Sequence, residues 1–221
     1  MTTAGGRTWA IVLAAGRGDR FGSRKQFELI GRQTLVERAV VAVRARCDGV
    51  VVVAPAGAAD VVAGTSQVTG GASRAASVRA GLVAVPADAS VIVVHDAAHP
   101  LATAALVERV VAAVDAGADA VVPVVPVAET VARLDGAAVQ EIVPRRELVL
   151  VQMPHAFRSD ALRRAHAGLP EVSDEATLLH QQGRRVMTVA GEATNIHVTT
   201  PYELALAVAA ARSAGDGDDS D

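Results

Sequence analysis

Hydrophobic residues along the chain fall into short runs with little polar alternation, and longer stretches with a helical period separate them. The short runs predict strands at residues 9–13, 50–54, 91–95 and 120–125. The stretches between them predict helices at residues 34–46, 75–84 and 103–116. Apolar runs of this kind are typical of parallel strands covered on both faces. The pattern therefore predicts an α/β fold with a doubly wound, mostly parallel Rossmann-like sheet, whose ligands bind beyond the carboxyl ends of the strands.

The alternation of strands and helices breaks near residue 130. Asp135-Gly136 is a turn signal between two strand-like pieces, which predicts a β-arm over about residues 130–151 that leaves the main sheet. After this arm, Ser173 is the expected N-cap of a further helix. A strand near residues 185–190 and a helix at residues 201–212 complete one domain of residues 1–212. Residues 213–221 are acidic and glycine-rich and predict a disordered tail.

Composition limits the classes of partner. Only 2% of the residues are aromatic and the formal net charge is −3, so neither base stacking on nucleic acid nor binding to a membrane surface is expected. Cys47 is the only cysteine, which rules out an internal disulfide and fits a reducing compartment. No run is long and apolar enough to span a membrane, and the N-terminus lacks the apolar segment of a signal peptide. A cytoplasmic protein is expected.

The stretch "IVLAAGRGDRFGSRKQF" at residues 11–27 passes from an apolar strand into a loop of glycines and cations. Bare backbone N–H groups beside cations suit a polyanion such as phosphate. The run contains no P-loop, and the glycine that would complete a dinucleotide fingerprint comes one residue late, at Gly22. The excess of Arg and Lys suits a triphosphate that loses pyrophosphate, and favours it over a dinucleotide such as NAD.

Asp96 follows the apolar run at residues 91–94 and His95. A carboxylate at the carboxyl end of a central parallel strand is well placed to hold Mg²⁺, with waters and phosphate oxygens as the remaining ligands. A helix N-cap is the alternative role for Asp96. His95 is interpreted as a packed residue.

Seven motifs occur in one order along the chain. They are "LAAGRGDRFGSRKQF", "GGASRAASVRAGL", "VVHDAAHPL", "PVAETV", "VQMPHAF", "SDEATLL" and "NIHVTTPYELALA". This set resembles the 2-C-methyl-D-erythritol 4-phosphate cytidylyltransferases and their relatives that act on ribitol 5-phosphate, and the resemblance covers nearly the whole chain except the acidic tail. It implies the nucleotide-diphospho-sugar transferase type of fold and a homodimer formed through the arm.

The implied reaction is attack by an acceptor phosphate on the α-phosphorus of CTP, with Mg²⁺ as cofactor and release of pyrophosphate. Such chemistry depends on positioning and charge neutralisation. The resemblance assigns catalytic roles to Arg20, Lys25 and His197, and places Lys25 on the α-phosphate. It assigns nucleotide binding to a set of loop residues, namely Ala14, Ala15, Gly16, Gly18, Gly71, Arg74 and Ser77.

The acceptor half departs from the family pattern. The positions that match it are His99, Thr130, Arg145, Met153 and Ser173. His99 stands where the family usually has Arg, His197 where it has Lys, and Met153 where it has Thr. Because a charge-assisted hydrogen bond is worth about 1.5–3 kcal/mol, two lost cations matter for acceptor use. Either the acceptor differs, or its dianionic phosphate protonates the histidines, or turnover is poor.

Other classes remain open at the level of the sequence. A nucleotide-binding homologue that has lost transfer, and a transferase that uses UTP or GTP with a sugar phosphate, both fit the glycine loop. A polyol phosphate such as ribitol 5-phosphate is an alternative acceptor. A nicotinamide oxidoreductase is disfavoured because the sequence shows no hydride-relay constellation.

Overall fold

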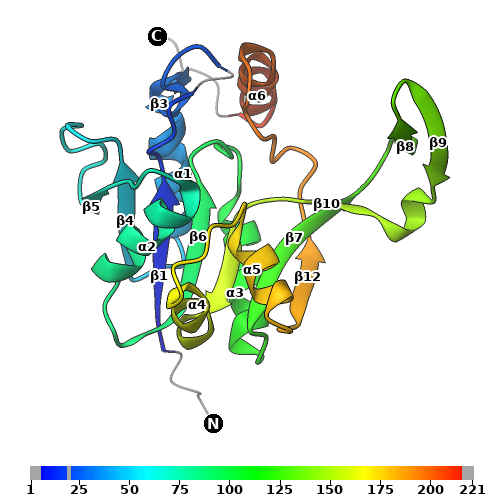
Figure 1. The fold of residues 1–221 in the computed structure, drawn as a ribbon. Coiled ribbons are helices and arrows are strands. Elements are labelled where there is room, and N and C mark those ends of the chain that lie inside the picture. Colours follow the sequence, from blue (N-terminus) through cyan, green and yellow to red (C-terminus); the bar gives the residue numbers. More distant parts are fainter. Residues whose placement is uncertain (1–5, 19–20, 216–221) are drawn as a thin grey trace.

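A computed structural model describes residues 6–18 and 21–215 of the protein. Its centre is an eight-stranded sheet with the order β10-β7-β11-β6-β1-β4-β5, in which β12 also pairs with β7 (Figure 1). The strands are β1 Arg7–Leu13, β4 Gly49–Ala54, β5 Ser66–Thr69, β6 Ala89–Asp96, β7 Ala120–Pro126, β10 Val149–Val151, β11 His155–Arg158 and β12 Val186–Ala190.

Six α-helices belong to the described part of the chain, and five of them cover the two faces of the sheet. They are α1 Leu35–Arg44, α2 Arg74–Ala84, α3 Ala104–Asp115, α4 Ser159–His166, α5 Glu175–Gln181 and α6 Pro201–Ser213. Helices α1 and α3 pack on one face, and α2, α4 and α5 on the other (Figure 1). The small strands β2 Leu29–Ile30 and β3 Gln33–Thr34 lie beside α6.

Successive residues of β1 show why its sequence lacks polar alternation. Ala10 and Val12 belong to the core cluster that holds α1 and α3, whereas Ile11 belongs to the cluster that holds α2 and α4. Side chains alternate between the faces of a strand, so a strand covered on both faces is apolar at every position. The predicted doubly wound sheet is confirmed, and its antiparallel pairs are confined to β10 and β11.

Two details of the prediction are wrong. The N-cap of α5 is Asp174, whose carboxylate accepts from the Thr177 N–H at 2.8 Å, and the Ser173 hydroxyl instead bonds this carboxylate at 3.2 Å. An ionised cap is favoured over a hydroxyl because it also interacts with the helix dipole. Residues 149–151 pair with β7 as β10 and so belong to the main sheet, outside the arm.

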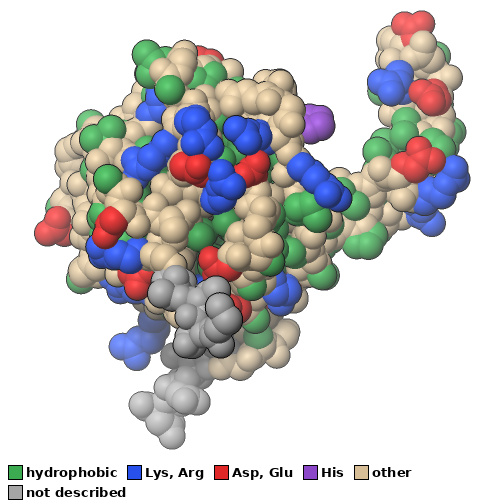
Figure 2. Space-filling view, turned by 90° about the horizontal axis from the view of Figure 1, so that it is seen from below, with side chains coloured by type: hydrophobic (Ala, Val, Ile, Leu, Met, Phe, Trp, Pro, Cys, Tyr) green, Lys and Arg blue, Asp and Glu red, His purple; other side chains and the backbone are tan. Residues whose placement is uncertain are grey.

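The remaining part of the predicted arm forms a separate hairpin. Strands β8 Val131–Asp135 and β9 Ala138–Val143 pair with each other in a two-stranded sheet. Figures 1 and 2 show this hairpin standing away from the body of the molecule, with hydrophobic side chains among its charged ones. Leu134, Val139 and Ile142 are all about 60% exposed (62%, 60% and 59%), which leaves a hairpin with little core of its own.

Gly81 allows α2 to pack closely on β1, and its replacement by Ala should lower stability. A Cβ atom at this position would lie 2.5 Å from Cγ2 of Ile11. Overpacking of a core costs about 1–3 kcal/mol, which exceeds the gain of about 1 kcal/mol in helix propensity. We expect a lower midpoint of thermal unfolding for Gly81→Ala. Val83→Ala on the same helix changes an 87% exposed side chain and should leave the midpoint near the wild-type value; an unchanged or raised midpoint for Gly81→Ala contradicts the close-packing account.

Candidate functional site

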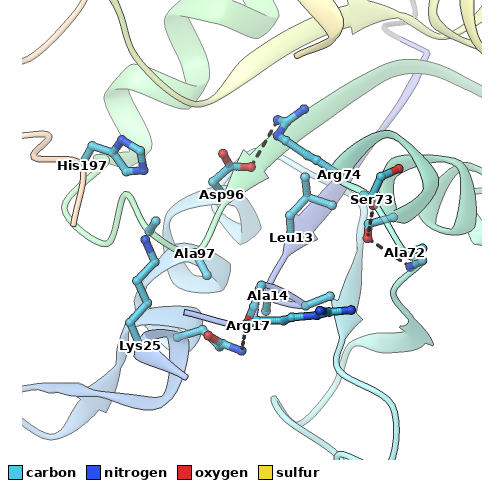
Figure 3. A pocket seen from close by; sticks show the side chains of 16 residues that line it. Leu13, Ala14, Arg17, Lys25, Ala72, Ser73, Arg74, Asp96, Ala97 and His197 are labelled. Carbon is cyan, nitrogen blue, oxygen red and sulfur yellow. Dashed lines mark hydrogen bonds and ion pairs between the residues drawn. The ribbon is translucent and has the colours of Figure 1, made fainter. Parts of the chain in front are cut away.

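A pocket of about 510 Å³ opens at the carboxyl ends of β1 and β6, within the size range of small-molecule sites. Five segments contribute to its wall: the end of β1 with the glycine loop, the short 3₁₀ helix Lys25–Phe27, the loop before α2, the end of β6, and the loop before α6. The lining residues that carry polar or charged side chains are Arg17, Lys25, Gln26, Ser73, Arg74, Ser77, Asp96 and His197 (Figure 3).

The glycine loop after β1 is fixed from two sides. The Gln26 side-chain amide donates to the Gly16 carbonyl at 3.1 Å, and the Ala14 N–H donates to the Val53 carbonyl at 2.8 Å. Gly18 has a φ of +77°, and a Cβ atom there would lie 1.7 Å from the Ser23 carbonyl oxygen. Gly18 therefore shapes the loop without lining the pocket, while Ala14, Ala15 and Gly16 do line it.

The loop before α2 lies directly against the first loop. A Cβ atom at Gly70 would be 2.3 Å from the Ala15 Cβ, so only glycine permits this approach. The Gly71 N–H donates to the Ser77 hydroxyl at 3.1 Å, and that hydroxyl donates to the Ser73 carbonyl at 2.9 Å. Ser77 thus holds the turn that presents Gly71 to the pocket.

Arg74 joins two carboxylates at the back of the pocket. Its Nη2 lies 3.3 Å from Oδ1 of Asp96, and its Nη1 lies 2.6 Å from Oε2 of Glu175. Burial alone would raise the pKa of Asp96, but the positive charge of Arg74 and neighbouring groups outweighs it, and the pKa lies below its usual value. Asp96 is therefore ionised at neutral pH and can bind a cation.

The sequence analysis did not single out Glu175. Its carboxylate is fully buried and lies behind Arg74, outside the pocket wall. A glutamate in the first turn of a helix is ordinary in sequence. Only the folded chain, in which α5 packs on α4, β7 and β12, brings this glutamate to its charge partner Arg74.

Lys25 and His197 occupy the opposite side of the pocket (Figure 3). The Lys25 ammonium donates to the Val198 carbonyl at 2.5 Å, which ties the 3₁₀ helix to the loop that carries His197. The His197 ring stacks on His99 with centroids 4.6 Å apart and an interplanar angle of 11°. Asp96 lies between the Lys25 side and the Arg74 side, so cations flank one carboxylate.

The histidines near Asp96 are buried and neutral at physiological pH. Burial lowers the pKa of His99 to about 3, and that of His95 and of His155 to about 4. Three side chains close to the acceptor positions of the family therefore carry no charge at pH 7. Burial therefore argues against the hypothesis, made from the sequence, that His99 is protonated when it meets the acceptor phosphate.

The five predicted acceptor residues are not brought into the pocket of a single chain. Met153 is 7% exposed and packs in the interior, and His99 lies beneath His197 at 6% exposure. Arg145 and Thr130 flank the hairpin, and the Arg145 guanidinium donates to the Ala128 carbonyl. Ser173 is exposed outside the pocket wall. Arg20, predicted to be catalytic, and residues 216–221 of the predicted tail lie outside the described residues.

The described residues contain no cluster of three or more metal-ligating side chains. The test for Mg²⁺ is therefore whether Asp96 alone suits it. Mg²⁺ is usually held by one or two carboxylates together with substrate phosphates and water, and a single ionised carboxylate facing a pocket lined by cations fits that pattern.

Among the residues that the structure describes, no helix is both long enough and apolar enough to cross a membrane.

Comparison with known proteins defines the class and then the family. A mostly parallel sheet with a glycine loop after β1 and a cation-lined pocket at its carboxyl edge fits an α/β nucleotidyltransferase, and a structural neighbour with this activity in its name shares the fold. Residues 8–213 match the model of the IspD family, 2-C-methyl-D-erythritol 4-phosphate cytidylyltransferase. The chain belongs to that family.

Individual relatives agree with this assignment. The chain is 40% identical to the 2-C-methyl-D-erythritol 4-phosphate cytidylyltransferase of Rhodococcus opacus, and the match covers 94% of this chain and 96% of that protein. It is also 40% identical to a bifunctional enzyme IspD/IspF of Solidesulfovibrio magneticus, of which it spans 57%. The crystal structure of the Thermus thermophilus cytidylyltransferase superposes with a TM-score of 0.80 at 37% identity, covering 91% of this chain and 98% of that one.

Gly70 offers a test of the contact between the two loops. Gly70→Ala places a methyl group against Ala15, and overpacking of about 1–3 kcal/mol should push the loops apart. We expect CTP, measured by titration calorimetry, to bind about tenfold or more weakly. Gly168→Ala is the control, because a Cβ atom there would meet nothing within 4 Å. Unchanged affinity in Gly70→Ala would show that the loop contact does not shape the binding site.

Proposed function

We propose that this protein transfers the cytidylyl group of CTP to the phosphate of 2-C-methyl-D-erythritol 4-phosphate and releases pyrophosphate, a step of isoprenoid precursor synthesis. Family membership supports the reaction. The structural observation that carries it is one pocket in which Lys25 and Arg74 flank the Asp96 carboxylate beside a glycine loop.

The reaction requires no covalent intermediate on the protein. An oxygen of the acceptor phosphate attacks the α-phosphorus of CTP, the bond from that phosphorus to the bridging oxygen breaks, and pyrophosphate leaves with the electron pair. The chain's contribution is to align the two substrates and to neutralise the charge that builds on the α-phosphate. Lys25 and Arg74 supply fixed positive charge from two sides, and the sequence resemblance adds Arg20 to them.

The glycine loops suit recognition of the nucleotide through backbone groups. Ala14, Ala15 and Gly71 line the pocket, and their N–H and C=O groups can match the hydrogen-bonding edge of cytosine. Mg²⁺, when bound, would neutralise part of the triphosphate charge, and Asp96 is the side chain that would hold it.

A homodimer through the β8–β9 hairpin accounts for acceptor residues that lie far from the pocket. Thr130 and Arg145 flank this hairpin, whose apolar side chains are exposed in a single chain. We propose that the hairpin of one subunit covers the pocket of its partner and brings these residues to the acceptor.

We propose a cytoplasmic location because Cys47 is the only cysteine of the chain, which fits a reducing compartment. Burial raises the pKa of the Cys47 thiol to about 12, so this thiol is unreactive.

A different polyol phosphate, such as ribitol 5-phosphate, is the second candidate acceptor. The observation that favours it is the stacked His99–His197 pair, in which His197 lines the pocket where the family usually has a lysine. A pocket with less fixed charge depends more on contacts to hydroxyl groups of the acceptor.

The central experiment incubates the protein with CTP, Mg²⁺ and a panel of polyol phosphates, and reads pyrophosphate release and product mass. We expect a cytidine diphosphate product with 2-C-methyl-D-erythritol 4-phosphate. Lys25→Ala should lower turnover by about 10²-fold or more, as does loss of one group that stabilises transition-state charge. Arg164→Ala, on the exposed side of α4, is the matched control. CTP binding without pyrophosphate release for any acceptor would instead identify a nucleotide-binding homologue.

Restoring a fixed charge at position 197 should improve acceptor use. His197→Lys is expected to raise kcat/KM for 2-C-methyl-D-erythritol 4-phosphate by about tenfold, since a charged hydrogen bond is worth about 1.5–3 kcal/mol. The KM for CTP should stay constant. His180→Lys adds the same charge at an exposed position of α5 and should have no effect.

The pH dependence of this gain tests the state of the imidazole. A gain larger at pH 8 than at pH 6 indicates that the negative charge of the acceptor phosphate helps His197 to take up a proton from solvent at pH 6, whereas equal gains indicate a neutral ring throughout. Burial holds the pKa of His99 at about 3, so His99 stays neutral at both pH values and does not contribute to the difference. No gain at either pH contradicts the view that missing fixed charge limits acceptor use.

A further inference from the structure

Glu175 is a buried carboxylate that belongs to the pocket's charge network without touching the pocket. It is 0% exposed, and the residues that line the pocket do not include it. Its Oε2 lies 2.6 Å from Nη1 of Arg74, a lining residue. Any effect of Glu175 on a bound nucleotide therefore has to pass through Arg74.

The position of Glu175 is fixed by the surrounding structure. It begins α5 directly after the Asp174 cap, and Leu178 and Leu179 anchor the same helix in the core. Burial raises the pKa of Glu175 and the charge of Arg74 opposes that rise. Within the described residues, its Oε1 has no hydrogen-bond partner, and Nε2 of His166 lies 3.9 Å away, but burial lowers the pKa of His166 to about 4 and leaves that ring uncharged. Arg74 is thus the group that compensates this carboxylate.

The two contacts of Arg74 are unequal. The contact to Glu175 is 2.6 Å long and involves a fully buried side chain. The contact to Asp96 is 3.3 Å long and involves a side chain that is 24% exposed. A short, desolvated ion pair is harder to break than a longer one at a wet surface. A phosphate entering the pocket would compete for the Asp96 contact and leave the Glu175 contact in place.

We propose, building on the cytidylyltransferase function above, that Glu175 is a positioning residue for the nucleotide. It holds one edge of the Arg74 guanidinium so that the other edge faces the pocket. That edge pairs with Asp96 in the structure. When the triphosphate binds, the edge turns to phosphate oxygen, and Asp96 becomes available to the cation that accompanies the nucleotide. Without Glu175, Arg74 would be free to stay on Asp96, and both groups would be poorly placed for the nucleotide.

The first arm of the test compares Glu175→Ala and Glu175→Gln with wild type. CTP affinity is measured by titration calorimetry with and without Mg²⁺, and KM values are measured for each substrate. We expect Glu175→Ala to raise Kd and KM for CTP by about 10- to 100-fold, the range for a lost charged hydrogen bond. The KM for the acceptor should stay within about twofold. Glu175→Gln keeps an acceptor for Arg74 and should restore most of the affinity.

The second arm is a double-mutant cycle with Arg74→Ala. If Glu175 acts through Arg74, then adding Glu175→Ala to Arg74→Ala should change the Kd for CTP by less than about twofold. The midpoint of thermal unfolding should rise in the double variant relative to Arg74→Ala, because an uncompensated buried carboxylate is removed. Asp160→Asn is the matched control, since Asp160 pairs with Arg158 and Arg164 on the surface of α4, outside the pocket wall.

Two results overturn the proposal: wild-type CTP affinity in both Glu175 variants, or an equal loss of affinity on adding Glu175→Ala to the Arg74→Ala background. If Glu175→Ala does not fold, then Glu175→Leu, which removes the acceptor for Arg74 but fills the buried space, takes its place in the same cycle. Calorimetry with CTP needs no acceptor. A protein that binds CTP but shows no transfer would therefore refute the proposed function while still testing the role of Glu175.

Discussion

The site depends on one arginine held between two carboxylates from different parts of the fold. Arg74 comes from the start of α2, Asp96 from the end of β6 and Glu175 from the start of α5. Each element reaches the same point because the carboxyl ends of the strands and the N-termini of the following helices meet at one edge of the sheet. The network neutralises a fully buried acid and keeps a guanidinium at the pocket wall. It also joins the N-termini of α2 and α5 to the end of β6.

The pocket combines fixed charges with uncharged rings. Lys25 and Arg74 carry charge that does not depend on physiological pH. His197 lines the pocket on the same side as Lys25 and stacks on the buried His99, and His155 is also buried. Burial keeps His99 and His155 neutral, so these rings offer stacking and neutral hydrogen bonds more than Coulomb attraction. We expect differences in acceptor use within the family to arise at these histidines.

The five residues predicted to bind the acceptor do not line the pocket within one chain. The β8–β9 hairpin pairs only with itself among the described strands, and its apolar residues are exposed. An isolated two-stranded hairpin is marginally stable in water, so a second surface that covers it would supply both stability and the residues that flank it. The proposed subunit exchange meets both needs with one contact, and it would make the activity of each pocket depend on its neighbour.

The sequence by itself indicated five strands of the main sheet, namely β1, β4, β6, β7 and β12, and every described helix except α4, but it missed β5 and β11. Residues 9–13, 50–54 and 91–95 are apolar at nearly every position because each strand is buried on both faces, and periodicity records that burial directly. The glycine loop could be recognised for a similar local reason, since Gly16 comes shortly after β1, Asp96 ends β6, and the carboxyl ends of parallel strands share one edge of the sheet. The Ser173 cap was misplaced by one residue because a serine and an aspartate, adjacent in sequence, compete for the same N–H groups.

Only the tertiary structure decided which residues of the site touch. Glu175 is 101 positions from Arg74, and no local pattern distinguishes its buried carboxylate from a solvated first-turn acid. His99 was expected to contact the acceptor, but its stacking beneath His197 and its neutral state depend on packing among β6, β11 and the loop before α6. The burial of a side chain and the compensation of its charge depend on residues that are distant in sequence, so only the folded structure determines them.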